Sequence, residues 1–201
     1  MPATGPATTR RLPRAERREA ILAAATQAFA RGGFTNTGME DIAAEAAVTR
    51  VILYRHFDSK ADLYRAVLTR ARQHLSAAAG APNYTGQIID ALLTAACRDP
   101  AGFRLLFHHA AREPEFAEES DRYHAEMTAI AHQQIAAMVP DPGWARWAAH
   151  LTPTATIAAI TAWLDAGQPD PDTAATRIRH AVTAIIDAAR RPPETGHPSG
   201  P

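Results

Sequence analysis

The sequence predicts an all-α fold. Apolar residues recur at three- and four-residue steps along most of the chain, which places them on one face of a helix. Helix-forming Ala, Leu, Arg and Glu dominate, and no stretch shows the alternating pattern of a strand. With 201 residues, of which 46% are hydrophobic and 21% charged, the chain is expected to fold as one large domain or as a small domain joined to a larger one.

The N-terminal segment, residues 1–13, is rich in Pro, Thr and Arg and is expected to form a flexible arm. The first helix, about residues 16–31, carries a single apolar face made by Ile21, Leu22, Ala25 and Phe29. Gly32-Gly33 is expected to end this helix, as glycine commonly does just beyond a helix C-terminus.

Three shorter helical segments follow. Thr37 and Glu40 have the spacing of a capping box for a helix over about 39–46. Thr49 is a plausible N-cap for a third helix that ends near Phe57-Asp58. Ser59 or Asp58 then caps a fourth helix, about 59–78, whose apolar positions are Leu63, Val67, Ala71 and Leu75.

The rest of the chain is also expected to be helical, over about 86–97, 100–113, 116–138, 144–165 and 172–190. Asp99-Pro100 is a clear start signal, because it combines an N-cap with a proline at the first helical position. Pro153 either kinks its helix or marks the beginning of one. The Pro- and Gly-rich tail, residues 192–201, is expected to be disordered.

Charge is distributed unevenly along the chain. Residues 1–75 contain 12 Lys and Arg against 7 Asp and Glu, and the remainder contains 9 against 14. A basic N-terminal module on an acidic body indicates a polyanionic partner for the first part, although uneven surface charge without a partner is the alternative.

Several classes of protein are disfavoured. No run of roughly 18 apolar residues could cross a bilayer, and the Arg-rich N-terminus lacks the apolar core of a secretion signal. The lone Cys97 excludes an internal disulfide and suits a reducing compartment. We therefore expect a cytoplasmic protein without membrane association.

Residues 39–57 have the pattern of a helix-turn-helix, with two short helices joined by about three residues on a basic module. Ala43 is small where the helices would cross, Ala47 lies in the turn, and a small core would be closed by Ile42, Val48 and Leu53. The outer face of the third helix would carry Arg50, Val51, Ile52, Tyr54 and Arg55. A plain helical hairpin is the alternative that spacing alone leaves open.

The stretch from Met39 to Tyr64 resembles the DNA-binding domain of the TetR/AcrR family of transcriptional regulators. The most specific parts are Leu53-Tyr54-Arg55-His56-Phe57 and Ser59-Lys60-Ala61-Asp62-Leu63-Tyr64, and the similarity extends over about residues 17–75. The resemblance implies a helix-turn-helix domain, residues 14–58, linked through the helix at about 59–78 to a helical regulatory and dimerisation domain, residues 79–191.

Family positions assign roles to individual residues. Thr49 and Arg50 would open the recognition helix in the major groove, with Arg50 reading a guanine edge. Tyr54, His56 and Lys60 match positions that contact phosphates, whereas Leu53, Phe57 and Leu63 match core positions. The full set of expected DNA contacts is Thr37, Thr49, Arg50, Val51, Ile52, Tyr54, Arg55, His56 and Lys60.

The chain departs from the family pattern at three places. Ala47 stands where glycine is usual, which costs on the order of 1 kcal/mol in a left-handed turn. Val51-Ile52 replaces the frequent Gly-Thr, so that a thymine methyl becomes a candidate contact. Gly38 replaces a frequent Thr. The Arg-rich arm could compensate on DNA, although a solvated tail is the simpler interpretation.

The resemblance also implies a homodimer formed through the last two helices, around an operator with two half-sites. The apolar residues considered for this interface are Ile157, Ala158, Ile160, Ala162 and Leu164, followed by Ile178, Val182, Ile185, Ile186 and Ala189. An ordinary intramolecular core is the alternative.

The middle helices are expected to surround a pocket for a small, mostly hydrophobic effector. Candidate ligand contacts are Phe103, Phe107, His108, Tyr123, Met127 and Trp147. No metal or cofactor is expected, because His108, His109, His124 and His132 do not form a ligand motif. No motif of an enzyme is present either. The sequence thus predicts a repressor released from operator DNA by an effector, or else a helix-turn-helix regulator without a small-molecule sensor.

Overall fold

The computed structural model describes residues 13–80 and 87–191, and within these ranges all regular structure is helical. The all-α prediction is confirmed. The chain divides into two compact units, residues 1–70 and 71–201, which are described in turn. The predicted arm (1–13, apart from Pro13), the break at 81–83 and the C-terminal tail (192–201) lie outside the described residues.

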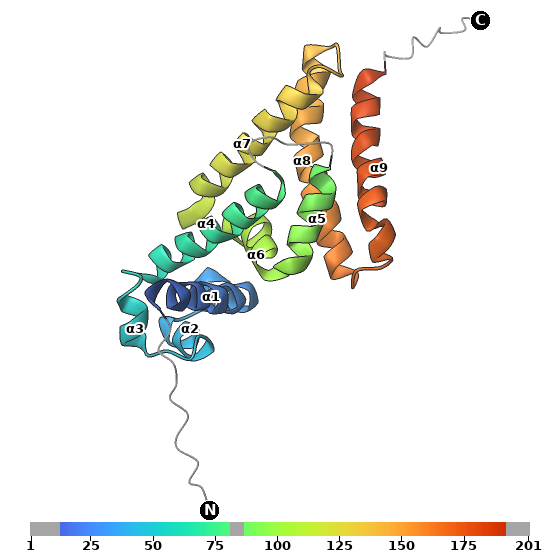
Figure 1. Ribbon diagram of the computed structural model, residues 1–201. Coiled ribbons are helices and arrows are strands. Elements are labelled where there is room, and N and C mark those ends of the chain that lie inside the picture. The colour runs from blue at the N-terminus through green and yellow to red at the C-terminus, as the bar shows by residue number, and fades with distance from the viewer. Residues whose placement is uncertain (1–12, 81–86, 192–201) are drawn as a thin grey trace, which may run out of the picture. The chain divides into compact units, whose positions relative to one another are not determined.

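The first unit contains α1 (Arg14–Asn36), α2 (Met39–Glu45), α3 (Arg50–Tyr54) and the beginning of α4 (Lys60–Ala78) (Figure 1). Its core is formed by side chains that are at most 2% exposed: Ile21, Leu22, Phe29, Ile42, Leu53, Phe57, Leu63, Tyr64 and Val67. Phe29 packs edge-on against Tyr64, with ring centroids 4.9 Å apart. This core fixes α2 and α3 on a frame made by α1 and α4.

The end of α1 differs from the prediction. The helical conformation is interrupted at Gly33, whose φ of 72° lies in the left-handed region, and one further turn runs to Asn36. The expected capping box is wrong, because Thr37 is only 4% exposed and its hydroxyl donates to the Gly33 carbonyl at 2.7 Å. The N-cap of α2 is Gly38, whose N–H donates to the Asp41 carboxylate at 2.8 Å.

The turn between α2 and α3 has the predicted form. Ala47 has a φ of 50°, so it adopts the left-handed conformation that was expected at this position. The N–H of Val48 donates to the Ala43 carbonyl at 3.0 Å, which closes the end of α2. Thr49 caps α3 as predicted, by accepting from the N–H of Ile52 at 3.4 Å.

The second unit contains the remainder of α4, α5 (Ile88–Arg98), α6 (Pro100–Arg104), α7 (Ala117–Ile135), α8 (Pro142–Asp165) and α9 (Pro171–Arg190). Between α6 and α7 the chain forms a π-helical turn (Leu105–His109) and two 3₁₀ turns (Ala110–Arg112 and Pro114–Phe116). The helix α8 packs against both α7 and α9 and lies between them (Figure 1). Within the described ranges, no helix is both long and apolar enough to cross a membrane.

Helix starts in this unit follow local sequence signals. Asp99 accepts from the N–H of Gly102 at 2.9 Å, with Pro100 in the first turn, as predicted. Asp141 caps α8 in the same way, which places its beginning at Pro142, before the predicted start. The helix continues through Pro153 rather than beginning there.

The apolar residues considered for the dimer interface are mostly used inside the subunit. Five of them are at most 9% exposed: Ile160, Leu164, Ile178, Val182 and Ala189. Their assignment to an intersubunit surface is wrong, since α8 meets α7 and α9 within the same chain. The alternative of an intramolecular core holds for them, whereas Ala158 and Ala162 remain exposed.

Candidate nucleic-acid interface and ligand cavity

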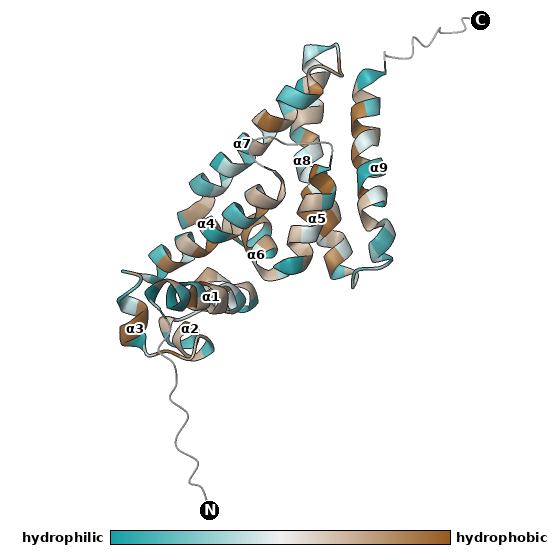
Figure 2. Ribbon diagram, viewed as in Figure 1, coloured by the Kyte–Doolittle hydropathy of each residue, from teal (hydrophilic) through white to brown (hydrophobic). Residues whose placement is uncertain are grey.

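The short helix α3 presents a surface that is polar at both ends and apolar between them. Leu53 is fully buried and anchors the helix, whereas Arg50 and Arg55 are exposed. Val51 is 63% exposed and Tyr54 is 44% exposed, and both belong to the few large apolar side chains of the described residues left at the surface. Figure 2 shows the resulting apolar colour on α3. In the major groove an apolar side chain can pack against a thymine methyl group, and arginines beside it can bind the acceptors of guanine. The exposed surface of α3 has this combination of side chains.

Arg50 is held by neighbours within this unit. Its guanidinium forms an ion pair with Glu40 of α2, donates to the Tyr54 hydroxyl at 3.5 Å and lies 5.5 Å from the centre of the Tyr54 ring. The hydrogen bond to Tyr54 and the charge of Glu40 raise the pKa of Arg50 above its ordinary value. Since both side chains of the ion pair are more than half exposed, the pair is weak and can be exchanged for DNA contacts.

Three arginines of the first helix create a positive environment for His56. Partial burial lowers the pKa of His56, and the charges of Arg14, Arg18 and Arg17 lower it further. Arg18 also lies over the Phe57 ring, 5.1 Å from its centre. These arginines were not predicted as part of the site, because they lie some forty residues before His56 in the chain. The closely spaced arginines at the start of α1 were the sequence feature that could have indicated their part in the site.

Two predicted DNA contacts have intramolecular roles. The Lys60 ammonium donates to the Phe34 carbonyl at 2.8 Å and lies 4.3 Å from the centre of the Phe34 ring. It therefore binds a carbonyl of the last turn of α1. Thr37 is buried with its hydroxyl donating inward, so its side chain is not exposed for DNA. The other predicted residues, Thr49, Arg50, Val51, Ile52, Tyr54, Arg55 and His56, are exposed or half-buried.

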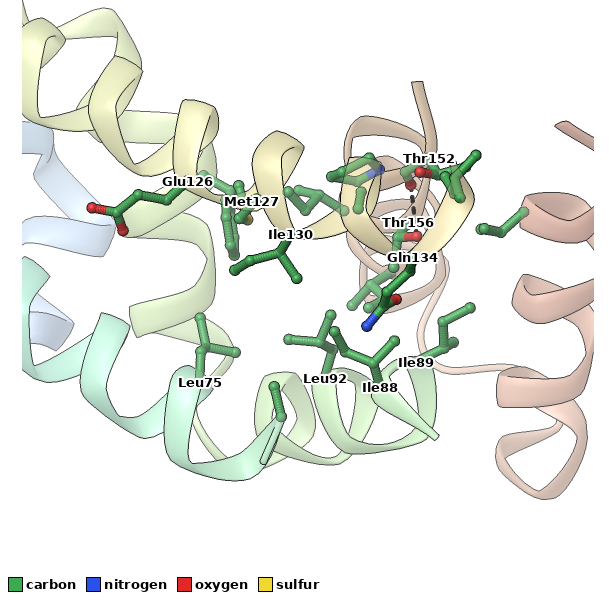
Figure 3. A pocket seen from close by; sticks show the side chains of 18 of the residues that line it. Leu75, Ile88, Ile89, Leu92, Glu126, Met127, Ile130, Gln134, Thr152 and Thr156 are labelled. Atoms are coloured by element: carbon green, nitrogen blue, oxygen red, sulfur yellow. Dashed lines mark hydrogen bonds between the residues drawn. The ribbon is translucent and has the colours of Figure 1, made fainter. Parts of the chain in front are cut away.

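The second unit contains a cavity of about 540 Å³, within the size range of small-molecule sites. Its wall is mainly apolar and comes from α4, α5, α7, α8 and α9, with Leu75, Ile88, Leu92, Met127 and Ile130 facing the interior (Figure 3). Four of the six predicted ligand contacts line it: Phe103, Phe107, Tyr123 and Met127. The α5 residues were missed because their apolar face is indistinguishable in sequence from ordinary core.

The other two predicted ligand contacts lie elsewhere. His108 lines a separate hollow of about 500 Å³ between α7, α8 and the π-helical turn. Trp147 lines neither space, is 41% exposed and packs edge-on against Trp144. The structure thus places the Trp147 side chain outside both spaces. No group of three or more metal-binding side chains occurs among the described residues.

Comparison with known proteins shows what these features resemble. Residues 21–67 match the model for bacterial regulatory proteins of the tetR family. The chain is 36% identical over 125 residues to the transcriptional activator FasR of Mycolicibacterium smegmatis, which covers 58% of this chain and 57% of FasR. It is 45% identical over 58 residues to the repressor BepR of Brucella suis, which covers 29% of this chain and 28% of BepR. The chain thus spans less than two thirds of the length of these curated relatives.

Solved structures resemble the chain over nearly its whole length. A TetR-like regulator from Rhodococcus superposes with a TM-score of 0.74 at 22% identity, covering 88% of this chain and 99% of that one. NalD of Pseudomonas aeruginosa, described as a secondary repressor of a multidrug efflux pump, superposes with a TM-score of 0.63 at 23% identity, covering 85% of this chain and 96% of NalD. At these identities the likeness establishes the fold.

Proposed function

We propose that this chain is a TetR-family transcriptional regulator, because residues 21–67 match the family model, and that it binds operator DNA as a homodimer and is released by a small, mostly apolar effector. The observation that carries this proposal is the exposed face of α3, inside the segment that matches the family model. In this proposal the protein acts as a repressor and performs no catalysis.

The contacts proposed for DNA divide by chemistry. Arg50 reads a guanine edge once it leaves Glu40, and Val51 with Ile52 packs on thymine methyl groups. Tyr54, Arg55 and His56 bind phosphates, as do the arginines at the start of α1. Thr49 caps α3 and brings its N-terminal N–H groups toward the backbone of the duplex.

Dimerisation is proposed through the exposed faces of α8 and α9. Ala181, Ala184 and Ala188 lie at three- and four-residue steps on α9, and Ala158 with Ala162 does so on α8. Small exposed side chains in these rows let two helices approach closely. Two copies of α3 would then reach successive half-sites, which supplies the affinity that one short helix lacks.

Binding to DNA upstream of the protein's own gene, measured by fluorescence anisotropy over a range of salt concentrations, tests the first part. We expect salt-sensitive, sequence-specific binding that Arg50→Ala weakens by at least tenfold. Arg122→Ala, which removes an exposed arginine of α7 that is paired with Glu118, serves as the control. Equal binding by Arg50→Ala and the unmodified protein would reject α3 as the reading element.

The dimer is tested by light scattering after size-exclusion chromatography. Ala184→Glu should give a folded monomer with weakened operator binding, whereas Ala125→Glu, on an exposed position of α7, should remain dimeric. A dimer that persists in Ala184→Glu would place the interface elsewhere. Repression is tested by deleting the gene, which should raise transcription from the bound promoter; lowered transcription would indicate an activator.

A further inference from the structure

We infer that the 540 Å³ cavity selects an uncharged, predominantly apolar ligand with a hydrogen-bonding group that meets Gln134 and Thr152. This inference rests on the proposed function only in taking the cavity as the effector site. It concerns the chemical class of the ligand.

The charges along the wall of the cavity balance. The charged residues that line the cavity are Arg72, Glu126 and Arg179. Arg72 is paired with Glu126 at 2.7 Å, and Arg179 is paired with Asp90 of α5. Each positive charge therefore already has a carboxylate partner, and the wall with these partners is electrically neutral.

A charged ligand group would be costly to place inside this cavity. A carboxylate or ammonium group that enters the apolar interior loses its hydration, which is expensive without a partner of opposite charge. A ligand carboxylate that approaches Arg72 would meet the negative charge of Glu126 beside it. A ligand ammonium would meet the same problem with Arg72.

The uncharged polar groups of the wall lie near one another. Gln134 extends from α7 toward Ile88 and Ile89 of α5, and Thr152 and Thr156 lie across from it on α8 (Figure 3). The Thr156 hydroxyl donates to the Thr152 carbonyl at 2.8 Å. The buried Thr152 hydroxyl and the exposed Gln134 amide can donate to or accept from a ligand, at the far end of the cavity from the Glu126 carboxylate (Figure 3).

Binding of 1-decanol, decanoate and decylamine, below their micellar concentrations and in the absence of DNA, tests this inference by calorimetry. The three probes share one chain and differ in the charge of one end. We expect decanol to bind at least tenfold more tightly than either charged analogue. Equal or tighter binding of a charged analogue, or failure of all three to bind, would overturn the inference.

A charge switch sharpens the test. Glu126→Gln should leave Arg72 without its carboxylate partner and raise decanoate binding relative to decanol by at least tenfold. The double variant Glu126→Gln with Arg72→Gln should restore the original preference, and an unaltered ratio in the single variant would overturn the argument from charge. Gln134→Met should weaken decanol binding about three- to tenfold, as expected for one hydrogen bond.

The proposed function can fail separately. If decanol binds with the expected selectivity but leaves operator affinity unchanged, the ligand class stands and release by an effector is rejected. Circular dichroism and the melting temperature of each variant establish that it is folded before binding is compared.

Discussion

The guanidinium of Arg50, in the first turn of α3, forms an ion pair with the carboxylate of Glu40 in α2. Both groups belong to the helix-turn-helix, so the residue proposed to read DNA is occupied before DNA arrives. DNA binding must exchange the Glu40 contact for contacts with a base. Glu40 therefore competes with DNA for the Arg50 guanidinium. A guanine edge displaces Glu40 most effectively, because it offers two hydrogen-bond acceptors to the guanidinium.

Replacement of Glu40 should strengthen DNA binding, because Arg50 then has no carboxylate partner to leave. In Glu40→Gln, Arg50 no longer has to leave a carboxylate, so binding to random-sequence DNA should rise about two- to fivefold, in line with the strength of exposed ion pairs. Operator binding, in which Arg50 leaves Glu40 completely, should rise by at least as much. The control is Glu45→Gln, which removes a carboxylate paired with Arg31 instead. Identical effects of the two variants would show that only net charge matters.

The lowered pKa of His56 predicts a pH dependence of DNA binding. His56 is neutral at pH 7 because partial burial and the nearby arginines disfavour its charged form. Phosphates favour the charged form, so DNA binding takes up a proton and strengthens as the pH falls from about 7.5 to about 5.5. His56→Gln should lose this increase and His74→Gln should keep it, measured by anisotropy at constant salt. An undiminished increase in His56→Gln would exclude the residue as its source.

His56 should make the folded protein less stable as the pH falls, although it makes DNA binding stronger. The folded pKa of His56 lies below the unfolded value, so the unfolded chain binds the proton first as the pH falls below about 6.5. The contribution of His56 to stability is therefore present at neutral pH and is lost on acidification. Urea denaturation should show a smaller loss of unfolding free energy toward about pH 5.5 in His56→Gln than in the unmodified protein.

Glycine at the turn should stabilise the helix-turn-helix. Ala47 adopts a φ of 50°, where a Cβ atom costs on the order of 1 kcal/mol. Ala47→Gly should raise the unfolding free energy by up to about 1 kcal/mol, less the greater entropy that glycine gives the unfolded chain. Ala46→Gly, next to it with a φ of −81°, should lower the free energy instead. The same sign for both variants in urea denaturation would contradict this account.

Thr37 should matter for stability and not for phosphate binding. In Thr37→Val the buried hydroxyl that bonds the Gly33 carbonyl is lost, so the unfolding free energy should fall by about 1–3 kcal/mol. Thr37→Ser keeps the hydroxyl and should lose less. The dependence of operator affinity on salt should be unchanged in both, since no phosphate contact is removed. A reduced salt dependence in Thr37→Val would restore Thr37 as a DNA contact.

Filling the cavity should uncouple DNA binding from the effector. Leu92 of α5 lines the cavity, and Leu92→Trp should occupy part of its volume while operator affinity is retained. Decanol binding should fall by at least tenfold in calorimetry. Thr94→Trp, on an exposed position of the same helix, should bind decanol normally. Full decanol binding by Leu92→Trp would show that the probe occupies a different site.

Local features of the chain were determined by the sequence itself. Thr49 and Asp99 cap helices because a side chain and an N–H three residues later are neighbours once a helix begins. The spacing of apolar residues predicted the helices and the buried Leu53, and the motif around it indicated the family. These interactions join residues that are close in the chain, so one sequence is enough to recognise them.

Other features were decided by tertiary structure. The Lys60 ammonium meets the Phe34 carbonyl across 26 residues, and Arg14, Arg17 and Arg18 meet His56 across about forty. Ile160 and Ile178 lie on apolar helix faces of the kind expected at an interface between subunits. Packing of α8 against its neighbours nevertheless buries both side chains within the subunit. Spacing predicts which face of a helix is apolar, but only the packed structure decides whether that face meets the same chain, a cavity or a second copy.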